Sequence, residues 1–90
     1  MPQISVIVIN EVGLHARPAA VFVEAAKRYK SEIIVKYGDQ SANAKSIISI
    51  LILGVVKNSN IIIEAEGEDA NQALTALKAL VENNFWEKNE

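Results

Sequence analysis

The sequence predicts an α+β domain in which helices cover one face of a mainly antiparallel β-sheet. Short β-branched runs alternate with amphipathic segments of helical period along the 90 residues. Several connections between these segments are too short for the crossovers that parallel strands need. Half of the residues are apolar, which suffices for one modest core in a chain of this length. The expected order is β-α-β-β-α-β-α.

The first strand is predicted at residues 4–9, where the run ISVIVI is rich in β-branched residues. A helix is predicted over residues 16–29, because apolar residues recur there at i, i+3, i+4 and i+7. These residues are Ala19, Phe22, Val23 and Ala26. Lys27 and Arg28 fall in the expected last turn, where positive charge complements the helix dipole.

Glu32–Tyr37 is predicted to be the second strand, and the turn-rich residues 38–44 leave room for one short edge strand. Residues 46–53 favour a strand by propensity. However, Ser46 suits a helix N-cap and Gly54 suits a helix stop, so we predict a short helix. The residues expected on one face of this helix are Ile47, Ile50 and Leu51.

Asn60–Glu66 is predicted to be the last strand. The final helix is expected to begin at Asp69, which has Gln72 three positions later in a capping-box arrangement. Its apolar stripe is Ala70, Ala73, Leu74, Leu77, Leu80 and Val81. We expect one domain over residues 1–90, with residues 83–90 as a frayed tail.

The composition excludes several classes of site and partner. The chain has no cysteine, so it has no disulfide framework, thiolate zinc site or iron–sulfur cluster, and it suits a reducing cytoplasm. A net charge of −2 gives no broad electrostatic reason to bind nucleic acid. The longest apolar run, residues 46–56, is about half of the roughly 20 residues a membrane helix needs. We expect a cytoplasmic protein without membrane insertion or a signal peptide.

The single histidine, His15, lies where the first helix begins. Pro18 suits the first turn of a helix, which places His15 at or just before the N-cap. The unpaired backbone N–H groups of Ala16 and Arg17 would then lie near the ring and form an anion site. The Arg17 guanidinium adds a fork that can grip phosphate oxygens.

This arrangement favours a phosphoryl acceptor. The positive helix end disfavours the imidazolium form, so the ring stays neutral and nucleophilic. The same donors stabilise a phosphoryl group on a ring nitrogen. The chain has no GxxxxGK(S/T) loop, no kinase motifs, no carboxylate cluster with metal spacing and no second histidine. Another protein would therefore have to supply the phosphoryl group, unless His15 is simply a polar cap or surface residue.

Three segments carry a resemblance to a known family. GLHARPA, residues 13–19, resembles the active-site signature of HPr, the histidine-containing phosphocarrier family of the bacterial phosphotransferase system. NAKSIISILILG, residues 43–54, resembles its regulatory serine segment, and IEAEGEDANQAL, residues 63–74, resembles its final strand and helix entry. The likeness covers nearly the whole chain. It implies an open-faced β-sandwich of four antiparallel strands with three helices on one side.

The resemblance also implies roles for single residues in a carrier that is not itself an enzyme and needs no cofactor or metal. His15 would accept a phosphoryl group on Nδ1 from enzyme I charged by phosphoenolpyruvate and donate it to enzyme IIA, while Arg17 holds the phosphoryl oxygens. Ser46 would be the target of an ATP-dependent HPr kinase/phosphorylase, a signal that slows the carrier cycle. The residues that would meet partner proteins are Leu14, Ala20, Ile47, Ile48 and Leu51.

Other functions remain open at this stage. A paralogue in a regulatory branch would control nitrogen or carbon metabolism without sugar transport, using the same residues. A pure interaction module would use phosphorylated Ser46 to bind a transcriptional regulator, with no role for His15. A small-molecule-binding regulatory domain would need a ligand pocket, and no motif indicates one. Independently of these functions, Ser46 could be only an N-cap at a helix start. Because a carrier must present one face to several proteins, we expect a monomer.

Overall fold

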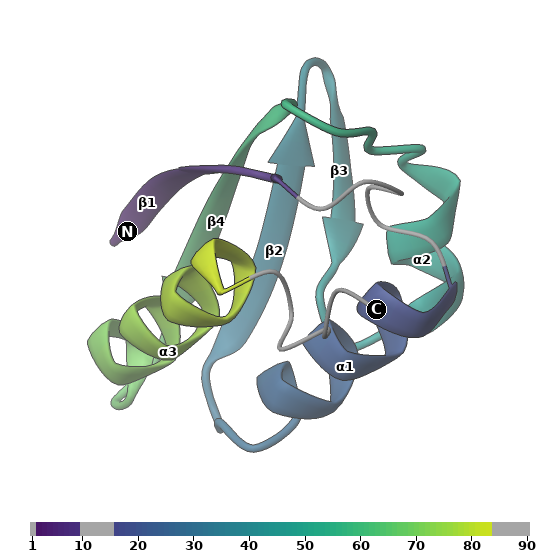
Figure 1. Ribbon diagram of the computed structural model, residues 1–90. Helices are drawn as coiled ribbons and strands as arrows, with labels where there is room; N and C mark the ends of the chain where they lie inside the picture. The colour runs from purple at the N-terminus through teal and green to yellow at the C-terminus, as the bar shows by residue number, and fades with distance from the viewer. Residues whose placement is uncertain (1, 10–15, 84–90) are drawn as a thin grey trace.

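The computed structural model describes residues 2–9 and 16–83. These residues form four strands and three helices (Figure 1). The elements in chain order are β1 (Gln3–Ile7), α1 (Ala16–Ala26), β2 (Glu32–Tyr37), β3 (Gln40–Asn43), α2 (Ile47–Ile52), β4 (Asn60–Glu66) and α3 (Ala70–Glu82). This order is the predicted one, including the short edge strand and the short helix.

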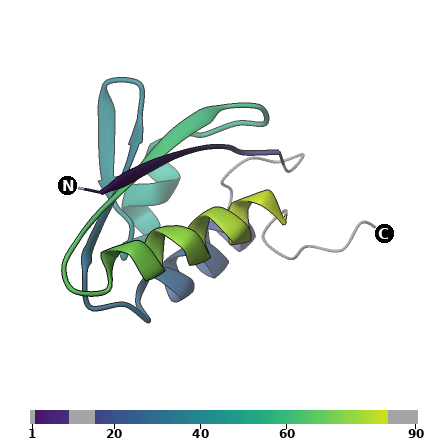
Figure 2. The ribbon, with the colours of Figure 1, turned by 90° about the vertical axis from the view of Figure 1, so that its left-hand side faces the viewer.

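The strands form one sheet in the order β1-β4-β2-β3, and every neighbouring pair is antiparallel. Figures 1 and 2 show the helices gathered on one side of this sheet. The predicted fold, a four-stranded antiparallel sheet with helices on one face, is therefore confirmed.

The core lies between the sheet and the helices because strand side chains alternate between the two faces. On β2 the buried residues are Ile33 and Val35, and on β4 they include Ile61, Ile63 and Ala65. All four predicted core residues of α1 and all six of α3 are buried against them. Helical periodicity alone therefore located both helix stripes correctly.

The opposite face of the sheet is free of helices and more polar. Ser5 on β1 donates a hydrogen bond to Asn60 at 2.7 Å, and Lys36 on β2 forms a 2.9 Å ion pair with Glu64 on β4. The Lys36 side chain is about half exposed, whereas that of Glu64 is largely buried, so solvent screens the pair from one side only. We call this surface the open face.

The strand β1 ends earlier than predicted because of an irregularity in its partner. The Val8 N–H donates to the Ser59 carbonyl at 2.9 Å, while the Val8 carbonyl accepts from Asn58 at 2.6 Å. Two residues thus face one, as in a β-bulge. Asn58 has a φ of 70°, the left-handed conformation that asparagine tolerates at such positions.

The helix α1 ends at Ala26, three residues before the predicted end. The N–H groups of Arg28 and Tyr29 bond to carbonyl groups three residues back, which is a tighter turn than an α-helix makes. Lys27 and Arg28 therefore follow the helix, and the expectation that they occupy its last turn is wrong. In the turn that follows the helix, Lys45 Nζ donates a hydrogen bond to the Tyr29 carbonyl at 2.7 Å.

Asp69 begins α3, but its side chain does not cap the helix, so the predicted capping box is wrong. The carboxylate instead accepts hydrogen bonds from the N–H groups of Lys30 at 2.8 Å and Ser31 at 2.9 Å, and from the Ser31 hydroxyl. These three hydrogen bonds to the carboxylate replace the single bond that a side-chain N-cap would make within the helix. The contact ties the start of β2 to the turn between β4 and α3.

The backbone at Gly67 allows this close approach. A Cβ atom there would lie 2.8 Å from the Ser31 Cα, and its φ of +147° disfavours other residues. We expect Gly67→Ala to lower the free energy of unfolding by about 1–3 kcal/mol, measured by urea denaturation. Gly38→Ala is the matched control, since its φ is +60° but nothing lies within 4 Å of the added Cβ. An equal or larger loss at Gly38 would contradict the steric argument.

The same contact predicts a pH dependence of stability. The Ser31 hydroxyl, followed by the Lys30 N–H, lowers the pKa of Asp69 below its ordinary value of 3.8. The charged carboxylate therefore stabilises the fold above pH 3.8, and this contribution is lost as the pH falls through the lowered pKa.

We expect Asp69→Asn to unfold at a lower urea concentration than the wild type at pH 7, and the difference to shrink as the pH falls below 3.8. Urea titrations followed by circular dichroism across this range measure it. Glu68→Gln, a change at an exposed neighbour, is the control and should show no such trend. A difference between Asp69→Asn and the wild type that stays constant with pH would contradict the assignment.

Candidate functional site

The start of α1 provides the first part of the site. The helix begins at Ala16, as predicted, and Pro18 is buried in its first turn. Arg17 is exposed, so its guanidinium is accessible from solvent. The first-turn N–H groups have no partner within the helix, which makes this end favourable for an anion. His15 and Leu14 lie outside the described residues, so their placement stays a prediction.

Ser46 provides the second part, at the start of α2. Its backbone is extended, with φ −123° and ψ 115°, and its Oγ accepts a hydrogen bond from the Ser49 N–H at 3.3 Å. The Ser46 carbonyl accepts from Ile50 at 3.1 Å, the first bond of the helix. Ser46 is therefore the N-cap that the sequence predicts. The residue is half-buried, so one side of it meets solvent.

An apolar surface lies on α2. Of its residues only Ile50 is fully buried, whereas Ile48 is 70% exposed and Ile52 is 73% exposed. Ile47 and Leu51 are exposed to a lesser degree, as we expected for two residues of the predicted docking patch. We call the side chains of Ile47, Ile48, Leu51 and Ile52 the α2 surface.

The α2 surface and the start of α1 belong to the same end of the molecule. The two helices are in contact, and Figure 1 shows the first turn of α1 beside α2. Ala20, also predicted to meet partners, is half-buried on α1. The structure thus places Ile47, Ile48 and Leu51 of the predicted patch together on α2, and no partner is present to test the role of the patch. Ile52 is missing from that prediction, and its i, i+4 spacing from Ile48 is the pattern that would have indicated it.

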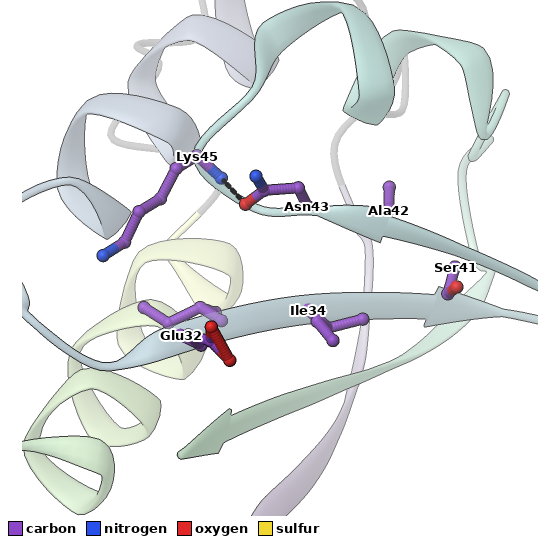
Figure 3. Close-up of a pocket in the computed structure, with 7 residues that line it drawn as sticks. Glu32, Ile34, Ser41, Ala42, Asn43 and Lys45 are labelled. Carbon is purple, nitrogen blue, oxygen red and sulfur yellow. Dashed lines mark hydrogen bonds between the residues drawn. The ribbon is translucent and has the colours of Figure 1, made fainter. Parts of the chain in front are cut away.

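A separate pocket of about 390 Å³ lies between β2 and β3 (Figure 3). Glu32, Ile34, Ser41, Asn43 and Lys45 are among its lining residues. Two of its polar groups already have partners, since Asn43 Oδ1 accepts from the Lys45 N–H at 2.9 Å and Lys45 Nζ donates to Tyr29. None of the residues predicted for the site lines this pocket.

Within residues 2–9 and 16–83, no three or more His, Cys, Asp or Glu side chains gather to hold a metal ion. No helix there has the length and apolar character needed to cross a membrane.

Comparison with known proteins places this geometry in a family. A family model described as the PTS HPr component phosphorylation site matches residues 2–83. Phosphocarrier protein HPr of Mycoplasma pneumoniae is 43% identical over 83 residues, which are 91% of this chain and 94% of that protein.

Solved structures agree with this match. The crystal structure of HPr-C-His from Thermoanaerobacter tengcongensis has a TM-score of 0.94 at 40% identity and covers 99% of this chain and 100% of its own. That of phosphocarrier protein HPr from Bacillus anthracis has a TM-score of 0.86 at 44% identity and covers 89% and 95%. The resemblance seen in the sequence is confirmed: this chain belongs to the HPr family of phosphocarriers of the phosphotransferase system.

Proposed function

We propose that this protein accepts a phosphoryl group on His15 from enzyme I and donates it to an enzyme IIA domain. The observation that carries the proposal is the start of α1 at Ala16, directly after His15, within the match to the family's phosphorylation-site model. A phosphoryl group on the His15 ring would then lie close to the unpaired N–H groups of a helix start.

Phosphoryl transfer requires few catalytic groups from this chain. A neutral ring nitrogen forms a bond to phosphorus while the bond to the donor breaks, and the protein mainly positions and stabilises the charged oxygens. Arg17 is exposed beside this helix start and supplies a fork of N–H donors for those oxygens. The protein therefore acts as a carrier, and the proteins at each end of the transfer supply the rest of the catalytic machinery.

The α2 surface supports a docking role next to this site. Partners would contact Ala20, Ile47, Ile48 and Leu51, and Leu14 as well. Exposed isoleucine and leucine side chains gain free energy when a partner covers them, at about 25 cal/mol per Å² of buried apolar area. Because four such side chains form a small patch, the complexes should be transient, which suits a carrier that must leave each partner.

Ser46 is proposed as the regulatory phosphorylation site of an HPr kinase/phosphorylase. Its hydroxyl oxygen is an N-cap acceptor, and its side chain precedes Ile47 at the edge of the α2 surface. A phosphate would add about two negative charges there and disfavour an acidic or apolar partner surface. The phosphorylated form would also offer a new surface to a transcriptional regulator. We further propose that the protein works in the cytoplasm, as a monomer in its carrier role and without a cofactor.

The histidine assignment predicts a specific adduct. Incubation with phosphoenolpyruvate and enzyme I should add one acid-labile phosphoryl group to the wild type and none to His15→Ala, as followed by mass spectrometry at neutral and acid pH. Arg17→Ala should keep the adduct but slow its formation by roughly 10²-fold, the usual effect of losing one charge-stabilising donor. An equal adduct on wild type and His15→Ala would refute the site.

The serine assignment predicts a difference between two substitutions at one position. Ser46→Asp should slow phosphoryl transfer from enzyme I, because it places a charge beside the α2 surface. Ser46→Ala is the matched control: it should lower the free energy of unfolding by about 1 kcal/mol through loss of the cap and leave the transfer rate unchanged. Stopped-flow transfer assays and urea denaturation measure the two effects. Equal transfer rates for Ser46→Asp and wild type would count against the charge mechanism.

Sugar transport and the regulatory branch use the same residues of this chain. Transfer assays with enzyme I and enzyme IIA paralogues of both branches separate them, since the faster pair identifies the branch.

A further inference from the structure

The pocket of about 390 Å³ between β2 and β3 is bordered by side chains of the open face. Lys36 belongs to that face, and side chains two residues apart on a strand share a face, so Ile34 and Glu32 do too. The β3 residues paired with this row, Ser41 and Asn43, lie on the same side. The volume is near the lower end of the range of about 300–1,000 Å³ for small-molecule sites, so the pocket suits a small ligand.

Two opposite charges line the pocket without pairing with each other. Glu32 lies on β2, and Lys45 follows β3 on the facing segment. The two segments still run side by side here, since the Ala44 N–H donates to the Ile33 carbonyl at 2.9 Å. Figure 3 shows Glu32 and Lys45 on these facing segments with no bond drawn between them. Within residues 2–9 and 16–83, no hydrogen bond or ion pair engages the exposed Glu32 carboxylate.

The side of the pocket opposite Glu32 offers hydrogen-bond donors. Lys45 Nζ donates one of its three N–H groups to the Tyr29 carbonyl and keeps two. The Asn43 side chain uses its Oδ1 to accept from the Lys45 backbone N–H, which leaves its NH₂ group as a donor. The pocket therefore has an acceptor with negative charge on one strand and a positive group with an amide donor on the facing segment.

Glu32 also faces a like charge on its other side. Glu66 of β4 lies directly opposite Glu32 in the register of the two strands, and both side chains are exposed. The Cβ atoms of directly opposite residues are about 4.5–5.5 Å apart, so two carboxylates in these positions repel each other. A positive group bound at Glu32 would relieve this repulsion.

We propose that this pocket binds the zwitterion of an α-amino acid with an apolar side chain. The ammonium group donates to the Glu32 carboxylate, the ligand carboxylate accepts from Lys45 and Asn43, and the side chain lies against the half-buried Ile34. A ligand with only a positive charge would be repelled by Lys45, and one with only a negative charge by Glu32. An α-amino acid carries both charges on one carbon and so satisfies both sides of a small pocket.

Binding should be weak, with a dissociation constant in roughly the millimolar range, because exposed ion pairs contribute little free energy. The pocket contains none of the residues proposed for phosphoryl transfer or regulation. Failure of the phosphoryl-transfer proposal therefore leaves this inference intact, and the reverse also holds.

NMR titration of the protein with three related compounds tests the charge requirement. L-leucine carries both charges, 3-methylbutylamine is the same molecule without the carboxylate, and 4-methylpentanoate is the same molecule without the amine. L-leucine should cause saturable shift changes at the amides of Ile34, Ser41 and Asn43, and each analogue should bind at least about tenfold more weakly, because it loses one charge-assisted contact. Absence of saturable shifts with L-leucine, or equal affinity for either analogue, would overturn the proposal.

Substitutions on the two sides of the pocket should act in opposite directions on the two analogues. Glu32→Gln should weaken L-leucine binding at least about tenfold and strengthen binding of 4-methylpentanoate, because the repulsion of its carboxylate is removed. Lys45→Met should weaken L-leucine binding and strengthen that of 3-methylbutylamine. A general loss of structure would not produce this exchange of preference.

Asp39→Asn is the matched control, since it removes an exposed carboxylate from the turn between β2 and β3 that does not line the pocket. It should leave all three affinities unchanged. Glu32→Gln alters an exposed side chain without a partner in the described part of the chain, so it should fold normally, which circular dichroism checks. If folded Glu32→Gln binds L-leucine as tightly as the wild type, the pocket does not recognise the ammonium group and the proposal is wrong.

Discussion

The short length of α2 is the constraint from which the exposed α2 surface follows. Six residues make less than two helical turns, so the helix can direct one stripe of side chains into the core, and only Ile50 is fully buried. The isoleucines on its other sides stay in solvent. Burying Ile48 or Ile52 would stabilise the fold by about 1.5–3 kcal/mol each, so their exposure leaves that stability unrealised.

The packing of the longer helices decides where this surface lies. α1 and α3 cover the inner face of the sheet with complete apolar stripes, and α1 contacts α2 so that the exposed Arg17 belongs to the same end of the molecule. The uncharged β1 edge lies at the opposite end of the sheet. The packing thus places the exposed α2 surface and Arg17 at one end of the molecule, away from the β1 edge.

Local patterns in the sequence predicted most of the fold and part of the site. Helical periodicity located the buried stripes of α1 and α3, and the Ser46 cap followed from the residue type. The errors involve contacts between residues far apart in the chain. Asp69 binds the residues at the start of β2 instead of capping its own helix, and Lys45 bonds to the turn that follows α1. No local pattern contains such contacts, and the positions of His15 and Leu14 remain predictions.

The central claim is that partner proteins bind at the start of α1 and the α2 surface, and that they leave the open face of the sheet uncovered. NMR mapping of backbone amides during titration with unphosphorylated enzyme I tests this directly. The account predicts that the largest shift changes fall on Arg17, Ala20 and the residues of the α2 surface. Shift changes confined to open-face residues such as Ile34, Lys36 and Ile62 would contradict it.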